Sequence, residues 1–195
     1  MRNNNFMPFF LWGVTLFILQ VSCETNTPYP KPKAYLALSY PNPQYTLFES
    51  SFYKLPLNTQ AEIKSQTERG LEVYYPTLDA SLFLNYTVVN TSFEALEAGI
   101  ENKLSEHVKK ATAILEFPYE DVSSNKRGVL YEIKGDAASA AQFYVSDQSQ
   151  NFLSGALYFN IRPHYDSIYP AAQYVIRDLR QIISGIAWKT KVSAQ

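Results

Sequence analysis

The sequence predicts an α+β domain in which a mainly antiparallel β-sheet packs with two helices. Tyrosine and phenylalanine are abundant, with 15 and 12 copies, and aromatic residues favour strands. Several short runs of strand character are separated by turn residues, and strands joined by short turns pair in antiparallel fashion. Two longer segments place apolar residues at helical spacing, which adds two helices to the sheet.

The first group of strands precedes the first helix. Residues 35–40 alternate and predict a strand, residues 45–57 have room for one or two short strands, and residues 58–69 are too polar to assign. Residues 71–75 alternate in a strand that ends at Pro76. The next strand has one apolar face and one polar face. The apolar face consists of Leu82, Leu84, Tyr86 and Val88, and the polar face includes Asn85 and Thr87.

The first helix begins after residue 90. Thr91 and Glu94 form a capping box, in which each side chain accepts a hydrogen bond from a backbone N–H at the helix start. The apolar stripe of this helix consists of Phe93, Leu96, Ile100, Leu104 and either His107 or Val108.

Four strand-like runs follow, at residues 113–119, 128–134, 141–145 and 155–161. Turn residues separate the first three, so hairpins are expected there. The fourth run is almost entirely apolar, which predicts a central strand that is covered on both faces.

The last element is a helix that begins near Ser167, which is expected to cap it, with Pro170 tolerated in the first turn. Its apolar stripe consists of Ala172, Val175, Ile176, Leu179, Ile182, Ile183 and Ile186. The charged residues Arg177, Asp178 and Arg180 are expected to face solvent, and Trp188 ends the packed region.

The N-terminus predicts export and lipid attachment. Residues 1–22 begin with the positive Arg2 and continue with an apolar run of about 14 residues, short of the roughly 20 that span a bilayer. Cys23, the only cysteine, follows as in a bacterial lipoprotein signal, so we expect its lipidation with acyl chains such as palmitate. The alternatives are a transmembrane anchor or a plain cleaved signal.

The lipidated Cys23 is followed by a proline-rich segment, and together they make up residues 23–33. Alternating prolines favour an extended conformation, so this segment is predicted to be a tether, with a proline-rich ligand as the alternative. Residues 34–190 are expected to form one α+β domain.

The composition excludes some functions. The chain has 17 Lys and Arg against 18 Asp and Glu, which gives no basic footprint for nucleic acid. With Cys23 acylated, no disulfide can form within the chain.

The sequence contains no recognisable catalytic or metal-binding motif. The two histidines, His107 and His164, have no zinc-ligand spacing. A triad of Ser139 or Ser154 with His164 and Asp166 lacks the turn that presents a nucleophilic serine. We therefore expect no enzyme activity, no metal and no cofactor.

The second half of the chain carries a specific resemblance. The stretches concerned are GVLYEIKG at 128–135 with AAS at 137–139, QFYVSD at 142–147, FLSGALYFN at 152–160, DS at 166–167 and WK at 188–189, with PKPK at 30–33 and VYYP at 73–76 upstream. Together they resemble the gliding-motility lipoprotein GldD family of Bacteroidota-type bacteria. The order of strands and helices is also similar to the Mog1/PsbP-type α+β fold, a likeness of architecture alone.

The resemblance implies a non-catalytic subunit of the gliding apparatus and of the associated type IX secretion machinery in the cell envelope. Its expected partners are the membrane, through the lipid, and other envelope proteins. A periplasm-facing anchor is expected, with the outer membrane preferred over the inner membrane. The alternative is a periplasmic lipoprotein that binds a small ligand or a carbohydrate.

Two features near the start of the last helix are candidate surface sites. Arg162, His164, Tyr165 and Tyr169 form a candidate partner surface, because tyrosine offers a large contact area with a polar end. Ser167, after Asp166, resembles an O-glycosylation site of some of these bacteria, and the alternative is that both residues cap the helix.

Overall fold

The structure of the protein is a computed structural model that describes residues 39–90, 92–108, 110–160 and 165–189. The chain divides into two units, residues 1–34 and 35–195, and all described residues belong to the second. Cys23, the proline-rich segment, Arg162 and His164 therefore lie outside the described residues.

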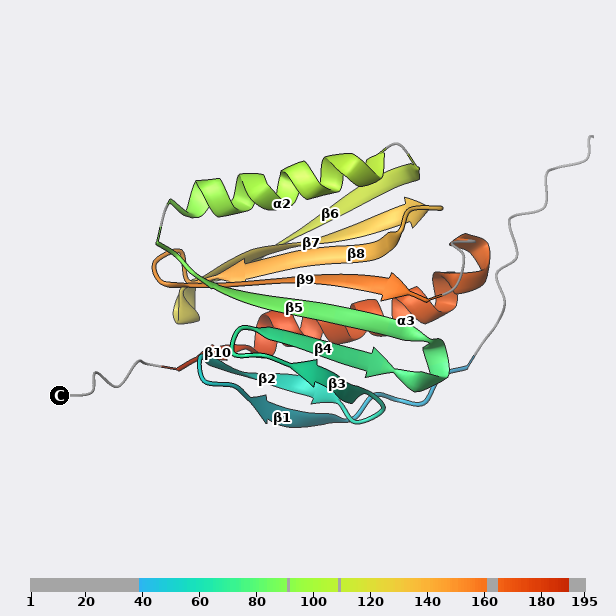
Figure 1. Ribbon diagram of the computed structural model, residues 1–195, viewed down its shortest axis with the longest axis horizontal. Helices are drawn as coiled ribbons and strands as arrows, with labels where there is room; N and C mark the ends of the chain where they lie inside the picture. Colours follow the sequence, from blue (N-terminus) through green and yellow to red (C-terminus); the bar gives the residue numbers. More distant parts are fainter. Residues whose placement is uncertain (1–38, 91, 109, 161–164, 190–195) are drawn as a thin grey trace, which may run out of the picture. The chain divides into compact units, whose positions relative to one another are not determined.

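The second unit contains ten strands and two α-helices within the described ranges (Figure 1). The strands are β1 (Tyr45–Glu49), β2 (Tyr53–Asn58), β3 (Glu62–Gln66), β4 (Gly70–Tyr75), β5 (Ala80–Val88), β6 (Ala111–Asp121), β7 (Lys126–Gly135), β8 (Ser139–Ser146), β9 (Asn151–Phe159) and β10 (Ala187–Trp188). The helices are α2 (Phe93–Val108) and α3 (Tyr165–Gly185), with short 3-10 turns η1 (Pro76–Leu78) and η2 (Val122–Ser124). This composition confirms the predicted α+β class.

The strands form two sheets rather than the single sheet expected. The larger has the order β3-β4-β5-β9-β8-β7-β6, the smaller has the order β1-β2-β10, and the pairings of both are antiparallel. The expected hairpins β6–β7 and β7–β8 are present. The first predicted strand, at 35–40, is not confirmed in its described part, because Ser39 and Tyr40 are irregular.

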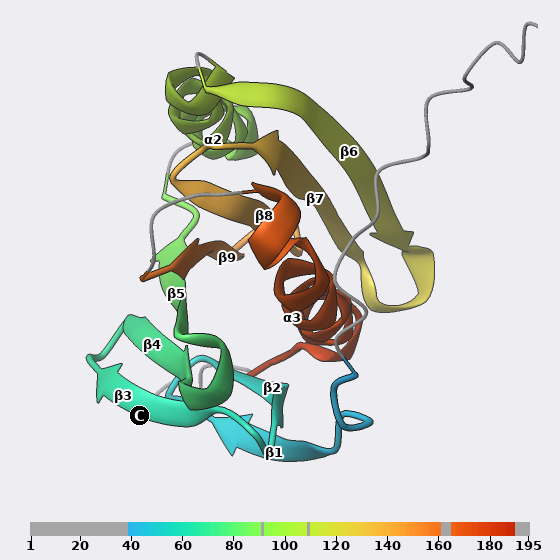
Figure 2. The ribbon, with the colours of Figure 1, turned by 90° about the vertical axis from the view of Figure 1, so that its right-hand side faces the viewer.

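The main core lies between α3 and the two sheets (Figure 2). α3 contacts β2 of the small sheet and β7 and β8 of the large one. The helix contributes fully buried residues such as Val175, Ile176 and Leu179, which meet apolar side chains of β2, β4, β5, β8 and β9. None of the described helices combines the length and the apolar character needed to cross a membrane.

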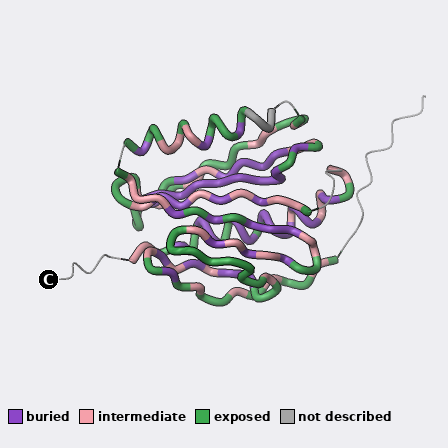
Figure 3. Tube along the Cα trace, viewed as in Figure 1, coloured by how far each residue is buried: buried purple, intermediate pink, exposed green. Residues whose placement is uncertain are grey.

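α2 covers only part of the opposite face of the large sheet. It contacts β6 and β8, and its Phe93, Ile100 and Leu104 pack on Tyr144 and neighbouring side chains. The prediction that β9 is covered on both faces is wrong. Its core-facing side chains are buried, whereas Ser154, Ala156 and Tyr158 on the other face are half-buried (Figure 3).

A buried carboxylate joins α3 to both sheets and corrects another prediction. Asp178, expected to face solvent, is only 1% exposed. It accepts hydrogen bonds from the Tyr45 hydroxyl (2.7 Å), the Asn58 amide (2.8 Å) and the Tyr75 hydroxyl (3.0 Å). Burial raises the pKa of Tyr45 and Tyr75, and Asp178 raises both further, so both tyrosines stay protonated donors. Asp178 is thus the polar centre of an otherwise apolar interface.

The ends of α3 are stabilised by residues from β7 and from the turn after it. The Asp136 carboxylate accepts a hydrogen bond from the backbone N–H of Tyr165, the first residue of the helix, at 3.1 Å. Ser167 therefore lies inside the helix, not at its start as predicted, and Pro170 is also internal. At the other end, the Lys126 ammonium donates to the carbonyls of Ser184 (2.8 Å) and Ile186 (3.2 Å), where a positive charge complements the helix dipole.

The turn between β8 and β9 gives one stability prediction. One carboxylate oxygen of Asp147 accepts hydrogen bonds from the backbone N–H groups of Ser149, Gln150 and Asn151, at 3.0, 2.8 and 2.8 Å. Burial opposes the charged form, but these bonds and the Asn151 side chain outweigh it and lower the pKa of Asp147 below its ordinary value of 3.8. A lowered pKa contributes stability that is present above the ordinary value and is lost as pH falls through the folded one.

Asp147→Asn should therefore lower the free energy of unfolding by about 1–2 kcal/mol at neutral pH. The difference from wild type should shrink as pH falls below the ordinary value of 3.8, because the wild-type carboxylate then becomes protonated. Chemical denaturation between neutral and strongly acidic pH measures this. A difference that stays constant across that range would contradict the role given to the charge.

Candidate functional site

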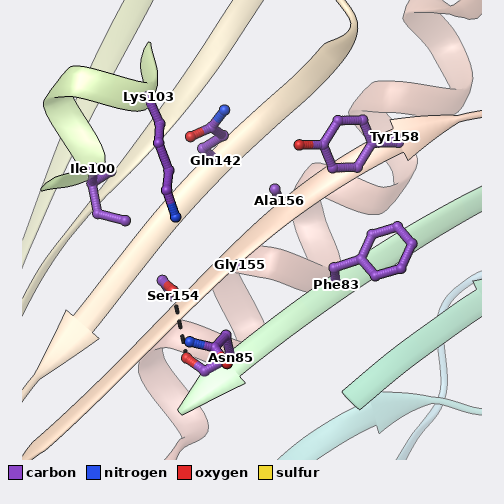
Figure 4. A pocket seen from close by; sticks show the side chains of 9 residues that line it. All are labelled: Phe83, Asn85, Ile100, Lys103, Gln142, Ser154, Gly155, Ala156 and Tyr158. Atoms are coloured by element: carbon purple, nitrogen blue, oxygen red, sulfur yellow. Dashed lines mark hydrogen bonds between the residues drawn. The ribbon is translucent and has the colours of Figure 1, made fainter. Parts of the chain in front are cut away.

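A cleft of about 550 Å³ lies on the open face of the large sheet, beside α2. We call it the sheet cleft (Figure 4). Strands β5, β8 and β9 provide its floor and α2 provides one wall; the lining residues are Phe83, Asn85, Ile100, Lys103, Gln142, Ser154, Gly155, Ala156 and Tyr158. Small-molecule sites commonly have volumes of about 300–1,000 Å³. The sheet cleft is therefore the candidate functional site.

The register of three strands explains why the floor is hollow. Ala156 of β9 lies opposite Phe83 of β5 on one side and opposite Gln142 of β8 on the other. The three side chains form one row across the sheet, with a methyl group between two large side chains. The space above Ala156 is thus bounded by an aromatic ring on one side and by a carboxamide on the other.

The aromatic side of the cleft is open to solvent. Phe83 is 46% exposed, although it belongs to a central region of the sheet. Its ring meets that of Tyr158 edge-on, with the centroids 5.8 Å apart and the planes at 70°. The pair offers a ligand an apolar surface together with the phenolic hydroxyl of Tyr158.

The opposite side of the cleft is polar. Gln142 is only 5% exposed, and its side-chain amide makes no hydrogen bond with any residue that the structure describes. On α2, Lys103 is exposed and forms no ion pair within the same described ranges. Lower on the floor, the Ser154 hydroxyl donates to the carbonyl of Asn85 at 3.5 Å. Gln142 lines the cleft and its amide makes no hydrogen bond to a described residue, so this amide is a group available to a ligand.

The wall formed by α2 is firmly attached to the sheet. Phe93 packs against Tyr144 and Phe152, whose rings stack with centroids 5.4 Å apart. The Tyr144 hydroxyl donates a hydrogen bond to the Glu97 carboxylate. Burial, and then this bond, raises the pKa of Tyr144, so the donor stays protonated at physiological pH. These contacts fix the position of Lys103, two turns along the same helix.

The residues predicted as a partner surface lie away from the sheet cleft. Tyr165 and Tyr169 are half-buried in the first turns of α3, with ring centroids 5.4 Å apart. Ser167 lies between them and is exposed. The remaining predicted site residues, Arg162, His164 and the lipidation site Cys23, are outside the described ranges. The predicted surface therefore stays a prediction.

The serines considered for a catalytic triad differ in environment. Ser139 is fully buried and its hydroxyl donates to the carbonyls of Ala141 and Leu157, at 3.0 and 3.1 Å, so it is unavailable to a substrate. Ser154 lines the sheet cleft, and the histidine of that triad, His164, is not described. Among the described residues, no group of three His, Cys, Asp or Glu side chains could hold a metal ion.

Sequence reasoning missed the residues of the sheet cleft. One signal was present, because Phe83 shares a strand face with Asn85 and Thr87, the face that the alternation marks as polar. A large aromatic residue on a polar face is a candidate contact residue. Gln142 gave no such signal, since its burial follows from the pairing of β8 with its neighbours.

Comparison with known protein families gives a match. The sequence pattern of the family described as gliding motility lipoprotein GldD matches residues 25–188, which include all the described strands and helices. A comparison with curated protein sequences finds no match.

Proposed function

The chain belongs to the gliding motility lipoprotein GldD family, and from this we infer a membrane-tethered, non-catalytic subunit required for gliding and for the associated type IX secretion machinery. The observation that carries this inference is the extent of the family match, which begins two residues after Cys23 and continues to Trp188. Membership of a lipoprotein family supports a lipid-anchored place in the cell envelope. The side of the membrane and the role in secretion are parts of the proposal.

The proposed mechanism is protein contact near a membrane. An acylated Cys23 would hold the domain at the membrane surface, where a tether raises its effective concentration beside embedded partners. We propose that the anchor faces the periplasm, with the outer membrane preferred, and that the partners are other envelope proteins of the apparatus.

Exposed apolar side chains at two strand edges support a contact function. Leu47 of β1 is 63% exposed and Ile63 of β3 is 47% exposed, and both line a cleft of about 480 Å³. Each of the two strands pairs on one side only, β1 with β2 and β3 with β4. Unpaired edges and exposed apolar residues are features of surfaces that bind other proteins. The surface around Tyr165 and Tyr169 is the second candidate.

A deletion strain tests the proposal. Cells without this chain should lose surface gliding and should retain type IX cargo proteins instead of releasing them, and a plasmid copy should restore both. Gliding that survives the deletion would overturn the proposal as a whole. Lost gliding with normal cargo release would remove the secretion part of it.

A ligand-binding lipoprotein is the second candidate function. The sheet cleft favours it, because exposed aromatic rings and unpaired polar groups converge there. A carbohydrate or another small ligand would then be handled by the same tethered domain.

A further inference from the structure

We propose that the sheet cleft binds a saccharide chain that carries carboxylate groups. The inference deepens the second candidate function and does not depend on the proposed role in gliding. It starts from the row formed by Phe83, Ala156 and Gln142 on the face of the large sheet.

The place of the cleft excludes recognition by strand addition. Its floor is made of β5, β8 and β9, which are interior strands of the sheet. Their backbone groups are paired with neighbouring strands, so an extended peptide finds no free N–H or C=O groups to join. A ligand must therefore be recognised through side chains.

The side chains present suit a sugar ring. The apolar C–H face of a pyranose packs on an aromatic ring, and Phe83 and Tyr158 expose such rings at one side of the floor. The Ala156 methyl group leaves room for a ring to lie flat between Phe83 and Gln142. Figure 4 shows the Tyr158 hydroxyl pointing across this space toward the side occupied by Gln142.

Gln142 is the strongest single indication of a ligand. It is 95% buried, lines the cleft and makes no hydrogen bond among the described residues. A carboxamide is both a donor and an acceptor, so it can bind two neighbouring hydroxyl groups, or an acetamido group, of one sugar. A ligand that supplies these bonds would replace the solvent at the amide with fixed partners.

The charges at the cleft indicate a carboxylate on the ligand. The Lys103 ammonium reaches over the floor from α2 and has no carboxylate partner within the described residues. The nearest acidic residue in the same row is Glu72, opposite Phe83 on β4. Glu72 already interacts with Lys64 at 3.3 Å and accepts a hydrogen bond from Ser81 at 3.2 Å. The free charge at the cleft is thus positive.

Isothermal titration calorimetry on the full-length lipoprotein in detergent tests the proposal. Four probes are compared: an oligosaccharide containing N-acetylmuramic acid, a hexuronic acid oligosaccharide, a neutral oligosaccharide of the same length, and an acidic peptide. The first two carry the proposed chemistry from two sources, the cell wall and a surface polysaccharide. One of them should bind at least tenfold more tightly than the neutral oligosaccharide and the peptide.

Variants assign the binding to the cleft. Gln142→Leu and Phe83→Ala should each weaken binding by at least tenfold, and Lys103→Gln should abolish the preference for the acidic sugar. The matched control is Phe117→Ala, because Phe117 is another exposed aromatic residue of the same sheet, 38% exposed and outside the cleft. It should leave binding unchanged.

Thermal unfolding tests whether Gln142 serves ligand binding or the stability of the fold. Gln142 makes no hydrogen bond to a described residue, so Gln142→Leu should leave the melting temperature of the ligand-free protein nearly unchanged while binding is lost. A marked fall in melting temperature would show that Gln142 serves the fold, and would overturn its assignment.

Other results would overturn the ligand class. These are no binding of either acidic saccharide, equal binding of the neutral one, tighter binding of the peptide, or an equal effect of the Phe117 control. Binding is measured on purified protein, so the absence of saccharide binding would not contradict the proposed role in gliding. Likewise, normal gliding of the deletion strain would not contradict the binding result.

Discussion

Replacing Asp178 by alanine is expected to lower the free energy of unfolding by about 4 kcal/mol. The carboxylate is 1% exposed and accepts hydrogen bonds from Tyr45, Asn58 and Tyr75. Alanine leaves all three donors inside the protein without an acceptor, and each buried unpaired group costs about 1–3 kcal/mol. Since these donors come from β1, β2 and β4, the loss should loosen α3 from both sheets at once.

Denaturant titration of two further variants measures how much of this loss comes from the charge of Asp178 and provides a control on the exposed side of the helix. Asp178→Asn keeps the size of the side chain and one acceptor, so it should lose about 2 kcal/mol, roughly half as much. Gln181→Ala on the exposed side of the same helix should change stability by less than about 0.5 kcal/mol. If Asp178→Ala behaved like Gln181→Ala, the buried network would have no stabilising role.

Gly128→Ala is expected to destabilise the protein by about 3 kcal/mol. A Cβ atom at Gly128 of β7 would lie 2.3 Å from the backbone carbonyl oxygen of Tyr144 and 3.1 Å from the Cα of Val145. Both atoms belong to the backbone of β8, which cannot rotate away as a side chain can. The two strands would have to separate locally, at the cost of the ladder that joins them.

Gly99→Ala is the matched control for this substitution. Gly99 lies inside α2, and a Cβ atom there would meet nothing within 4 Å. Alanine in a helix interior is favoured over glycine by about 1 kcal/mol, so this variant should be more stable than wild type. Equal effects of the two substitutions on the melting temperature would contradict the close approach of β7 and β8.

The sequence predicted those parts of the fold that have a regular pattern. Strands β4 to β9 and both helices follow from alternation, helical spacing and turn residues. β3 was missed because all five of its residues are exposed, as suits an edge strand, so no alternation is visible. The small sheet was missed because it depends on β10, a strand of two residues that pairs with β2 far away in the sequence.

The charge of Asp178 predicts a place on the exposed face of the helix, although its position in the helix favours burial. Tyr174 and Ile182 are four residues away on either side, so helical spacing places Asp178 on the buried face. Its charge suggested solvent instead, because only the folded chain brings Tyr45, Asn58 and Tyr75 around it.

The sheet cleft could not be predicted for a similar reason. Its row of Phe83, Ala156 and Gln142 exists only once the register of β5, β9 and β8 is known, and β5 pairs with β9 across a long stretch of sequence. The resemblance to a known family, carried by residues 128–160, did predict the family that the comparison identifies. The family gives no indication of which surface is used.

The tethered-subunit account is tested most directly by Cys23→Ala in the native cell, with membrane fractionation, gliding and secretion measured on the same strain. Acylated wild-type protein should be found in the membrane fraction. The variant should be released from the membrane, and the cells should fail to glide and to secrete type IX cargo. Protein released from the membrane in cells that still glide and secrete normally would contradict the account.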